Sequence, residues 1–162
     1  MKIRRAKLED LKEITNLRRK TIIKVNGKVL TKKHVNLLLK MNSKKNISKK
    51  IKNKAVVIAI ENNKIVGTIE LFNKEISGLY VKNNLINKGI GTKLIGYIEK
   101  LAKNRKNKKV KIICNYSSKE FYNKKGYKVI KEKILNKCEP QEKIFIMEKK
   151  LWNPFQAQTK KE

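Results

Sequence analysis

The chain has 162 residues, the length of one ordinary domain, and 40% of them are hydrophobic, which excludes a disordered protein. Its formal net charge is +30, from 43 Lys and Arg against 13 Asp and Glu. No apolar run approaches the roughly 20 residues of a membrane span, and no apolar stretch follows the N-terminus as in a secretory signal. We therefore expect a cytoplasmic protein without a membrane-spanning segment.

The positive charge has two interpretations. It comes from 38 Lys and only 5 Arg, and Lys, Asn and Ile together fill 77 positions. These three amino acids share A/T-rich codons, so a base bias of the genome explains the charge without a function. The alternative is association with nucleic acid or the ribosome. Because phosphate recognition usually recruits Arg for bidentate contacts, the excess of Lys favours codon bias.

The first third of the chain predicts one strand and two helices. Residues 2–6 form the expected strand. Apolar residues then recur at helical spacing between residues 8 and 22, which predicts a first helix. Asn-Gly at 26–27 is expected to end it. A second helix is expected over residues 31–41, with Thr as its N-cap. Residues 42–54 are polar and rich in Lys and Asn, which indicates a loop or a frayed short helix.

The middle of the chain predicts three strands. The apolar run at 55–60 and the strand at 65–72 are separated by Glu-Asn-Asn-Lys, which predicts a hairpin because Asn tolerates a positive φ. Residues 76–81 predict a further strand. A seven-residue loop follows, and it leads into the next helix.

The last part of the chain predicts two helices and three strands. The helices are expected over 89–104 and 117–125, on either side of a strand at 109–114. Residues 127–134 and 143–151 predict a final strand pair, and residues 152–162 a peripheral tail. The resulting order, β-α-α-β-β-β-α-β-α-β-β, is typical of a mixed α/β layer fold.

Two glycines open the helix at 89–104, in the run Gly89-Ile90-Gly91-Thr92. Glycines at a helix N-terminus let backbone N–H groups approach a phosphate, and the helix dipole favours the anion. The spacing does not fit a Walker loop, which needs Gly-Lys-Ser/Thr. A dinucleotide fingerprint is excluded too, because Leu94 occupies the place of its third glycine.

A second segment, Phe121-Tyr122-Asn-Lys-Lys-Gly126-Tyr127, follows the next predicted strand. Together with Leu-Tyr-Val at 79–81 and Ile-Asn-Lys-Gly-Ile-Gly at 86–91, it resembles the GCN5-related N-acetyltransferase (GNAT) family. The resemblance covers residues 1–151. It implies an α/β fold with a central mixed antiparallel and parallel sheet of about six to seven strands, flanked by about four helices. It also implies an enzyme that uses acetyl-coenzyme A (acetyl-CoA) as co-substrate.

The resemblance assigns site residues one by one. The strand ending at 79–81 faces the pantetheine arm, the loop from Asn87 to Thr92 holds the pyrophosphate, and Asn115 and Ser118 contact the pantetheine. The residues expected at the coenzyme are Leu79, Tyr80, Val81, Asn87, Lys88, Gly89, Ile90, Gly91, Thr92, Asn115, Ser118 and Tyr122. One residue departs from the pattern, since Ile86 stands where the family has Gln or Arg. Its side chain cannot donate to a phosphate, and Lys88 or Lys93 can supply charge instead.

Tyr122 corresponds to the family's general acid. A thiol has a pKa near 8.5 and a phenol one near 10, so a tyrosine can stabilise a developing thiolate and deliver a proton to it. The alternative is a core aromatic of a short helix.

An ammonium substrate must also lose a proton, and Glu70 and Glu75 are candidates for taking it. Surface carboxylates are the alternative interpretation of both. The single histidine, His34, lies in the expected second helix, which borders the acceptor site in this family; a structural or exposed histidine is the alternative. Cys114 and Cys138 show no metal-ligand spacing, so we expect reduced thiols and no metal.

The sequence does not choose between a small-molecule amine and a protein amine, such as one on a ribosomal protein, as the acceptor. It also does not decide whether the protein forms a homodimer. The stretch 24–54 contains no acid, so its field repels polycations such as polyamines and aminoglycosides. We therefore expect a neutral or anionic small amine, or a chain terminus on an acidic or nucleic-acid-bound partner. A cluster of Glu70, Glu75 and Glu132 would reverse this expectation.

Overall fold

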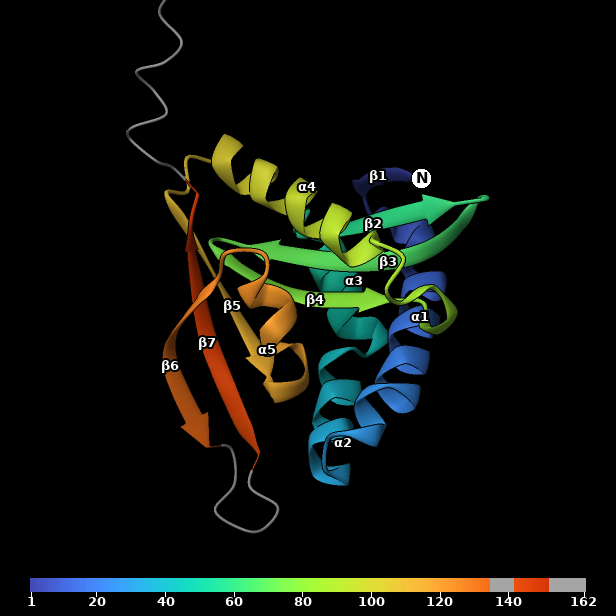
Figure 1. The fold of residues 1–162 in the computed structure, drawn as a ribbon. Coiled ribbons are helices and arrows are strands. Elements are labelled where there is room, and N and C mark those ends of the chain that lie inside the picture. Colours follow the sequence, from blue (N-terminus) through green and yellow to red (C-terminus); the bar gives the residue numbers. More distant parts are fainter. Residues whose placement is uncertain (135–141, 152–162) are drawn as a thin grey trace, which may run out of the picture.

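The computed structural model describes residues 1–134 and 142–151, which form a central sheet with helices on both faces (Figure 1). The sheet has seven strands in the order β1-β2-β3-β4-β5-β7-β6. The strands are β1 (Lys2–Arg5), β2 (Val56–Glu61), β3 (Lys64–Phe72), β4 (Glu75–Val81), β5 (Lys109–Asn115), β6 (Lys128–Ile134) and β7 (Lys143–Lys150).

The sheet consists of two antiparallel parts joined by one parallel pair. Strands β1 to β4 form an antiparallel meander in which β1 is added beside β2, and β5, β7 and β6 form the second antiparallel part. The join is β4 with β5, which pair at only two positions, Glu75 with Lys111 and Ile76 with Ile112. Beyond Ile76 the two strands diverge, so the second half of β4 has no sheet partner on that side.

Five α-helices cover the sheet in the described residues: α1 (Leu11–Lys24), α2 (Lys32–Met41), α3 (Lys44–Lys52), α4 (Ile90–Asn104) and α5 (Tyr116–Asn123). Helices α4 and α5 pack on one face over a core that includes Leu94, Ile98, Ile112 and Phe145. On the other face, α1 and α3 pack on a separate core that includes Ile14 and Ile58. Both cores come from apolar side chains at helical spacing set against β-branched residues of the strands.

The predicted order of elements and the mixed α/β class are confirmed, with two corrections. Residues 42–54 are not a loop, because α3 is a regular helix: Ser43 caps it, and Ile47 and Ile51 are buried. Spacing of four residues puts these two on one face, and the surrounding lysines mask this pattern. The first α-helix begins at Leu11 rather than Leu8, after a 3-10 turn in which Asp10 binds Arg4 at 2.7 Å.

Two predictions fall on residues that lie outside the described part of the chain. These are the peripheral tail at 152–162 and the free thiol of Cys138. The domain boundary at residue 151 stays a prediction.

Candidate functional site

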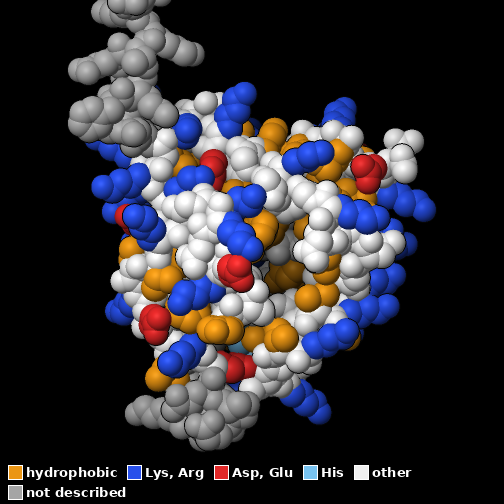
Figure 2. Space-filling view, in the orientation of Figure 1, with side chains coloured by type: hydrophobic (Ala, Val, Ile, Leu, Met, Phe, Trp, Pro, Cys, Tyr) orange, Lys and Arg blue, Asp and Glu red, His pale blue; other side chains and the backbone are white. Residues whose placement is uncertain are grey.

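Two cavities meet where β4 and β5 diverge. The first, here called the α4 cavity, has a volume of about 500 Å³ and lies between the end of β4, the start of α4 and α5. The second, the α2 cavity, has a volume of about 380 Å³ and lies between α2, β4 and β5. Both are lined by Leu79, Tyr80, Asn115, Ser118 and Tyr122. Figure 2 shows a hollow with hydrophobic side chains in its depth on the face where β4 ends.

The start of α4 presents backbone rather than side chains to its cavity. Gly89 is the N-cap residue, in the left-handed region at φ 78°, and no side chain caps the helix. An added Cβ at Gly89 would meet no atom within 4 Å. The first N–H groups of a helix have no partner within it, so this end of α4 is suited to an anion. The fit to a pyrophosphate therefore rests on backbone geometry.

The structure brings eleven of the twelve expected coenzyme residues together around the α4 cavity. The exception is Lys88, which is exposed and does not line it. Ile86 does line it and is 40% exposed, so the position where the family has Gln or Arg contributes an apolar wall. Thr21, Val25 and Asn26, at the end of α1, also line the cavity and were not predicted. No local motif marks them, because α1 reaches the site through tertiary packing.

Asn115 and Ser118 lie where the sequence places them, but their side chains bond to each other. Asn115 Oδ1 accepts a hydrogen bond from Ser118 N at 3.2 Å and from Ser118 Oγ at 2.9 Å. Asn115 is thus the N-cap of α5. This cap fixes the start of the helix that carries Tyr122.

Tyr122 is one of the residues that line both cavities. Its side chain is 6% exposed and packs edge-on against the rings of Phe121 and Tyr127. Burial, followed by the neighbouring Cys114 and Tyr80, raises the pKa of Tyr122 above its ordinary value. The phenol is therefore protonated throughout the neutral range and can act as a proton donor. A role in core packing is compatible with this, since the ring fills space as well.

Cys114 also lines the α2 cavity, and it is buried against Met147 with 3.4 Å between the sulfur atoms. Burial raises the pKa of the Cys114 thiol to about 11. A thiol is nucleophilic only as the thiolate. Cys114 is thus protonated at neutral pH and poorly suited to carry an acyl group.

Glu70 is buried at the α2 cavity, so its interpretation as a surface carboxylate is wrong. It is 3% exposed and forms ion pairs with Arg18, which is fully buried, and with Lys50 at 2.9 Å. Ser77 Oγ donates a third hydrogen bond to it. Burial alone would raise the pKa of Glu70, but the charges and hydrogen bonds of Arg18 and Lys50 outweigh burial and lower it.

A network of hydrogen bonds holds this ion pair in place. Arg18 Nε donates to Thr68 Oγ1, and Thr68 donates in turn to the carbonyl of Gly78. Gly78 lies at φ 58°, beside a register shift between β3 and β4, and an added Cβ there would be 2.8 Å from Glu70 Cδ. Glycine is required at this position both for its backbone conformation and for the closeness of Glu70. Asn42 completes the network, accepting from Arg18 and donating to the Tyr80 hydroxyl.

The sequence could have pointed to Arg18 through its spacing. Arg18 lies four residues after Ile14 and four before Ile22, on the apolar face of α1, where a basic residue needs a buried partner. Glu70 likewise interrupts an apolar strand, and together they form a pair separated by 52 residues. Nothing local links the two positions.

The other two carboxylates of the expected cluster lie elsewhere. Glu75 is exposed at the opposite end of β4, and Glu132 is exposed on β6, the edge strand; neither lines a described cavity. The cluster of Glu70, Glu75 and Glu132 is therefore not formed.

His34 lines the α2 cavity, and its Nδ1 lies 2.8 Å from Glu142 Oε2. Glu142 also accepts from the backbone N–H of Thr31. Burial would raise the pKa of Glu142, but its hydrogen bonds with Thr31 and His34 outweigh burial and lower it. This contact joins the start of α2 to the start of β7 and borders the α2 cavity.

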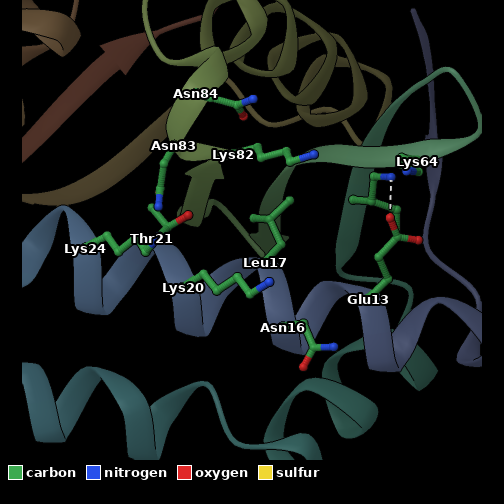
Figure 3. Close-up of a pocket in the computed structure, with 11 residues that line it drawn as sticks. Glu13, Asn16, Leu17, Lys20, Thr21, Lys24, Lys64, Lys82, Asn83 and Asn84 are labelled. Atoms are coloured by element: carbon green, nitrogen blue, oxygen red, sulfur yellow. Dashed lines mark hydrogen bonds between the residues drawn. The ribbon is translucent and has the colours of Figure 1, made fainter.

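A third cavity of about 460 Å³ lies between α1 and the segment after β4 (Figure 3). Four lysines line it, and none of them forms an ion pair within residues 1–134 and 142–151: Lys20, Lys24, Lys64 and Lys82. Its one acid, Glu13, accepts a hydrogen bond from the Ile65 N–H. We call this the lysine cavity.

Over the residues that the structure describes, no group of three or more His, Cys, Asp or Glu is placed to hold a metal ion. No helix in the same residues is long and apolar enough to cross a membrane.

Comparison with known proteins gives a family and a fold. The family model described as "Acetyltransferase (GNAT) domain" matches residues 27–139. No curated protein matches the chain by sequence.

Solved structures share the fold over nearly the whole chain. The PaiA N-acetyltransferase of Thermoplasma acidophilum in complex with coenzyme A is 24% identical, with a TM-score of 0.74 over 92% of this chain and 98% of that one. A GCN5-related N-acetyltransferase of Rhodopseudomonas palustris is 19% identical, with a TM-score of 0.81 over 92% and 94%. An aminoglycoside 6'-N-acetyltransferase complexed with coenzyme A is 17% identical, with a TM-score of 0.68 over 94% and 98%.

Proposed function

The chain belongs to the GNAT acetyltransferase family, and on that premise we propose that it transfers an acetyl group from acetyl-CoA to a primary amine. The proposal places the coenzyme in the α4 cavity and the amine in the α2 cavity. Two of the structural relatives hold coenzyme A, and the free backbone at the start of α4 fits its pyrophosphate. The second half of β4 has no strand partner on the β5 side, and there it offers backbone groups to the pantetheine arm.

The residues of the chain support direct transfer between the two cavities. The thioester of the coenzyme supplies the activated acetyl group. Tyr122 donates its proton to the sulfur as the carbon–sulfur bond breaks and the carbon–nitrogen bond forms. Cys114 is protonated and does not serve as a covalent relay. The proton lost by the amine passes to water, because the Glu70 carboxylate already accepts from three donors and Glu75 lies away from both cavities.

The observation that carries the proposal is the position of Tyr122 on the wall shared by both cavities. The test is an assay of free coenzyme A release from acetyl-CoA with a panel of small amines, peptides and ribosomal proteins. We expect release that depends on the acceptor. Release at the same slow rate with every acceptor would contradict the proposal.

A second candidate function is binding of nucleic acid by a basic protein on the same fold. The lysine cavity favours it, because four unpaired lysines there can contact phosphates. Titration with single-stranded RNA at low and at physiological salt tests it. Substitution of Lys20, Lys24 and Lys82 by Met should abolish any binding that depends on this cavity. The cytoplasmic location and a homodimer stay predictions.

A further inference from the structure

The α2 cavity combines an apolar wall with an excess of positive charge, and this combination defines a class of acceptor. The inference rests on the proposed function, since it assumes that the amine enters this cavity.

The apolar wall comes from both sides of the cavity. Leu37 and Met41 of α2 are 51% and 50% exposed, and Ile113 of β5 is 58% exposed. Large apolar side chains that stay exposed inside a cavity favour a ligand with an apolar body, because covering them removes apolar surface from water. Leu38 and Ile144 extend the same wall.

The charge at the cavity comes from the cluster around Glu70. Arg18 and Lys50 carry two positive charges against the single negative charge of Glu70, which leaves a net charge of +1. The cluster also has a spare hydrogen-bond donor, because Arg18 Nη2 is buried and has no hydrogen-bond partner among the described residues. A buried cluster with spare donors disfavours a second cation nearby and favours an anion.

Lys50 is the member of the cluster that a ligand can reach. It lines the α2 cavity, and its side chain is 35% exposed, whereas those of Arg18 and Glu70 are 0% and 4% exposed. An ammonium group has three donors, and Lys50 uses one on Glu70 at 2.9 Å. Two remain for a carboxylate of the ligand.

We propose that the acceptor is the primary amine of a small molecule with an apolar body and a carboxylate, and that Lys50 contacts this carboxylate. An apolar amino acid has all three features. Polyamines and aminoglycosides carry no carboxylate, and Glu70, the buried carboxylate that lines this cavity among the described residues, is already neutralised by Arg18 and Lys50.

Steady-state kinetics with three acceptors tests the proposal. L-Leucine carries the carboxylate, L-leucinamide has the same body without it, and 1,5-diaminopentane is a dication with no carboxylate. We expect kcat/KM to be highest for leucine and lowest for the diamine. In Lys50→Met, which keeps the length of the side chain, KM for leucine should rise about tenfold, as for loss of one charge-assisted hydrogen bond, while KM for leucinamide stays within about twofold.

Lys109→Met is the matched control, because Lys109 also forms an ion pair, with Glu148 at 3.1 Å, but lines neither cavity. This substitution should change neither the KM for leucine nor the KM for leucinamide. Preference for the diamine, or an equal effect of Lys50→Met on leucine and leucinamide, would overturn the proposal and leave acetyl transfer intact. Failure of all three acceptors would also overturn it, and the broader panel of amines then decides separately whether the protein is an acetyltransferase.

Discussion

The two cavities that meet at Tyr122 are built from different parts of the polypeptide. The α4 cavity is bounded by one continuous segment, from the end of β4 through the first turn of α4, together with α5 and the end of α1, and its anion-binding part is backbone. The α2 cavity shares α5 and the end of β4 with it, but is otherwise bounded by side chains from α2, α3, β3, β5 and β7, and its polar part is a buried ion cluster. A backbone site tolerates changes of side chain, whereas a side-chain site depends on each partner. We therefore expect the α2 side to determine specificity.

The largest expected effect is at Tyr122, which lines both cavities. Tyr122→Phe keeps the ring packing and removes the proton, so kcat should fall by about 10²–10⁴-fold, with the Kd for coenzyme A nearly unchanged. Because burial raises the pKa of Tyr122, wild-type activity should show no loss from this group up to about pH 9. Steady-state kinetics and calorimetric titration measure the two quantities. Wild-type turnover in the variant would leave Tyr122 as a core aromatic.

On the α2 side, removal of the Glu70 charge should destabilise the fold. Glu70→Gln leaves Arg18 buried without its counter-charge, and breaking a buried pair in this way costs about 3–5 kcal/mol. Denaturant unfolding measures the loss. Glu75→Gln is the control, because Glu75 is exposed, and it should change stability by less than about 0.5 kcal/mol. Equal stabilities of the two variants would show that the cluster contributes nothing.

On the α4 side, Gly89→Val should weaken coenzyme binding about tenfold. Steric crowding is not the reason, because an added Cβ at Gly89 meets nothing within 4 Å. The expected cost comes instead from the left-handed φ of 78°, which costs about 1–2 kcal/mol for a residue other than glycine. Thermal shift with coenzyme A measures the effect. Gly96→Ala, inside α4 with no close neighbour, should bind like wild type, and an unchanged shift in Gly89→Val would count against the placement.

The smallest expected effect is the loss of the stability that Glu70 contributes as the pH falls. The pKa of Glu70 is lower in the folded protein than its ordinary value. Between these two pKa values the unfolded chain binds more protons than the folded protein, so the free energy of unfolding falls as pH falls. The stability gap between wild type and Glu70→Gln should be full above about pH 5 and narrow as pH falls below about 4. Denaturation at a series of pH values checks this. A gap that does not change with pH would show that Glu70 is not ionised in the fold.

The two cavities also differ in how far the sequence predicts them. The glycines at 89 and 91 and the Phe-Tyr pair at 121–122 are local signals, and all of them line the α4 cavity. The partners of Glu70 were not predicted. Arg18 lies 52 residues away, and Lys50 belongs to α3, whose many lysines made the sequence resemble a polar loop. Pairing between distant segments depends on how α1 and α3 pack against β3, and no short pattern encodes this packing.

The most direct test of the account is a crystal structure of the protein with coenzyme A. We predict the pyrophosphate at residues 87–92 and the pantetheine along the second half of β4, on the side where β5 diverges from it. We also predict the sulfur within hydrogen-bond distance of the Tyr122 hydroxyl. Coenzyme A bound in the lysine cavity, or with its sulfur away from Tyr122, would contradict the assignment of the two cavities.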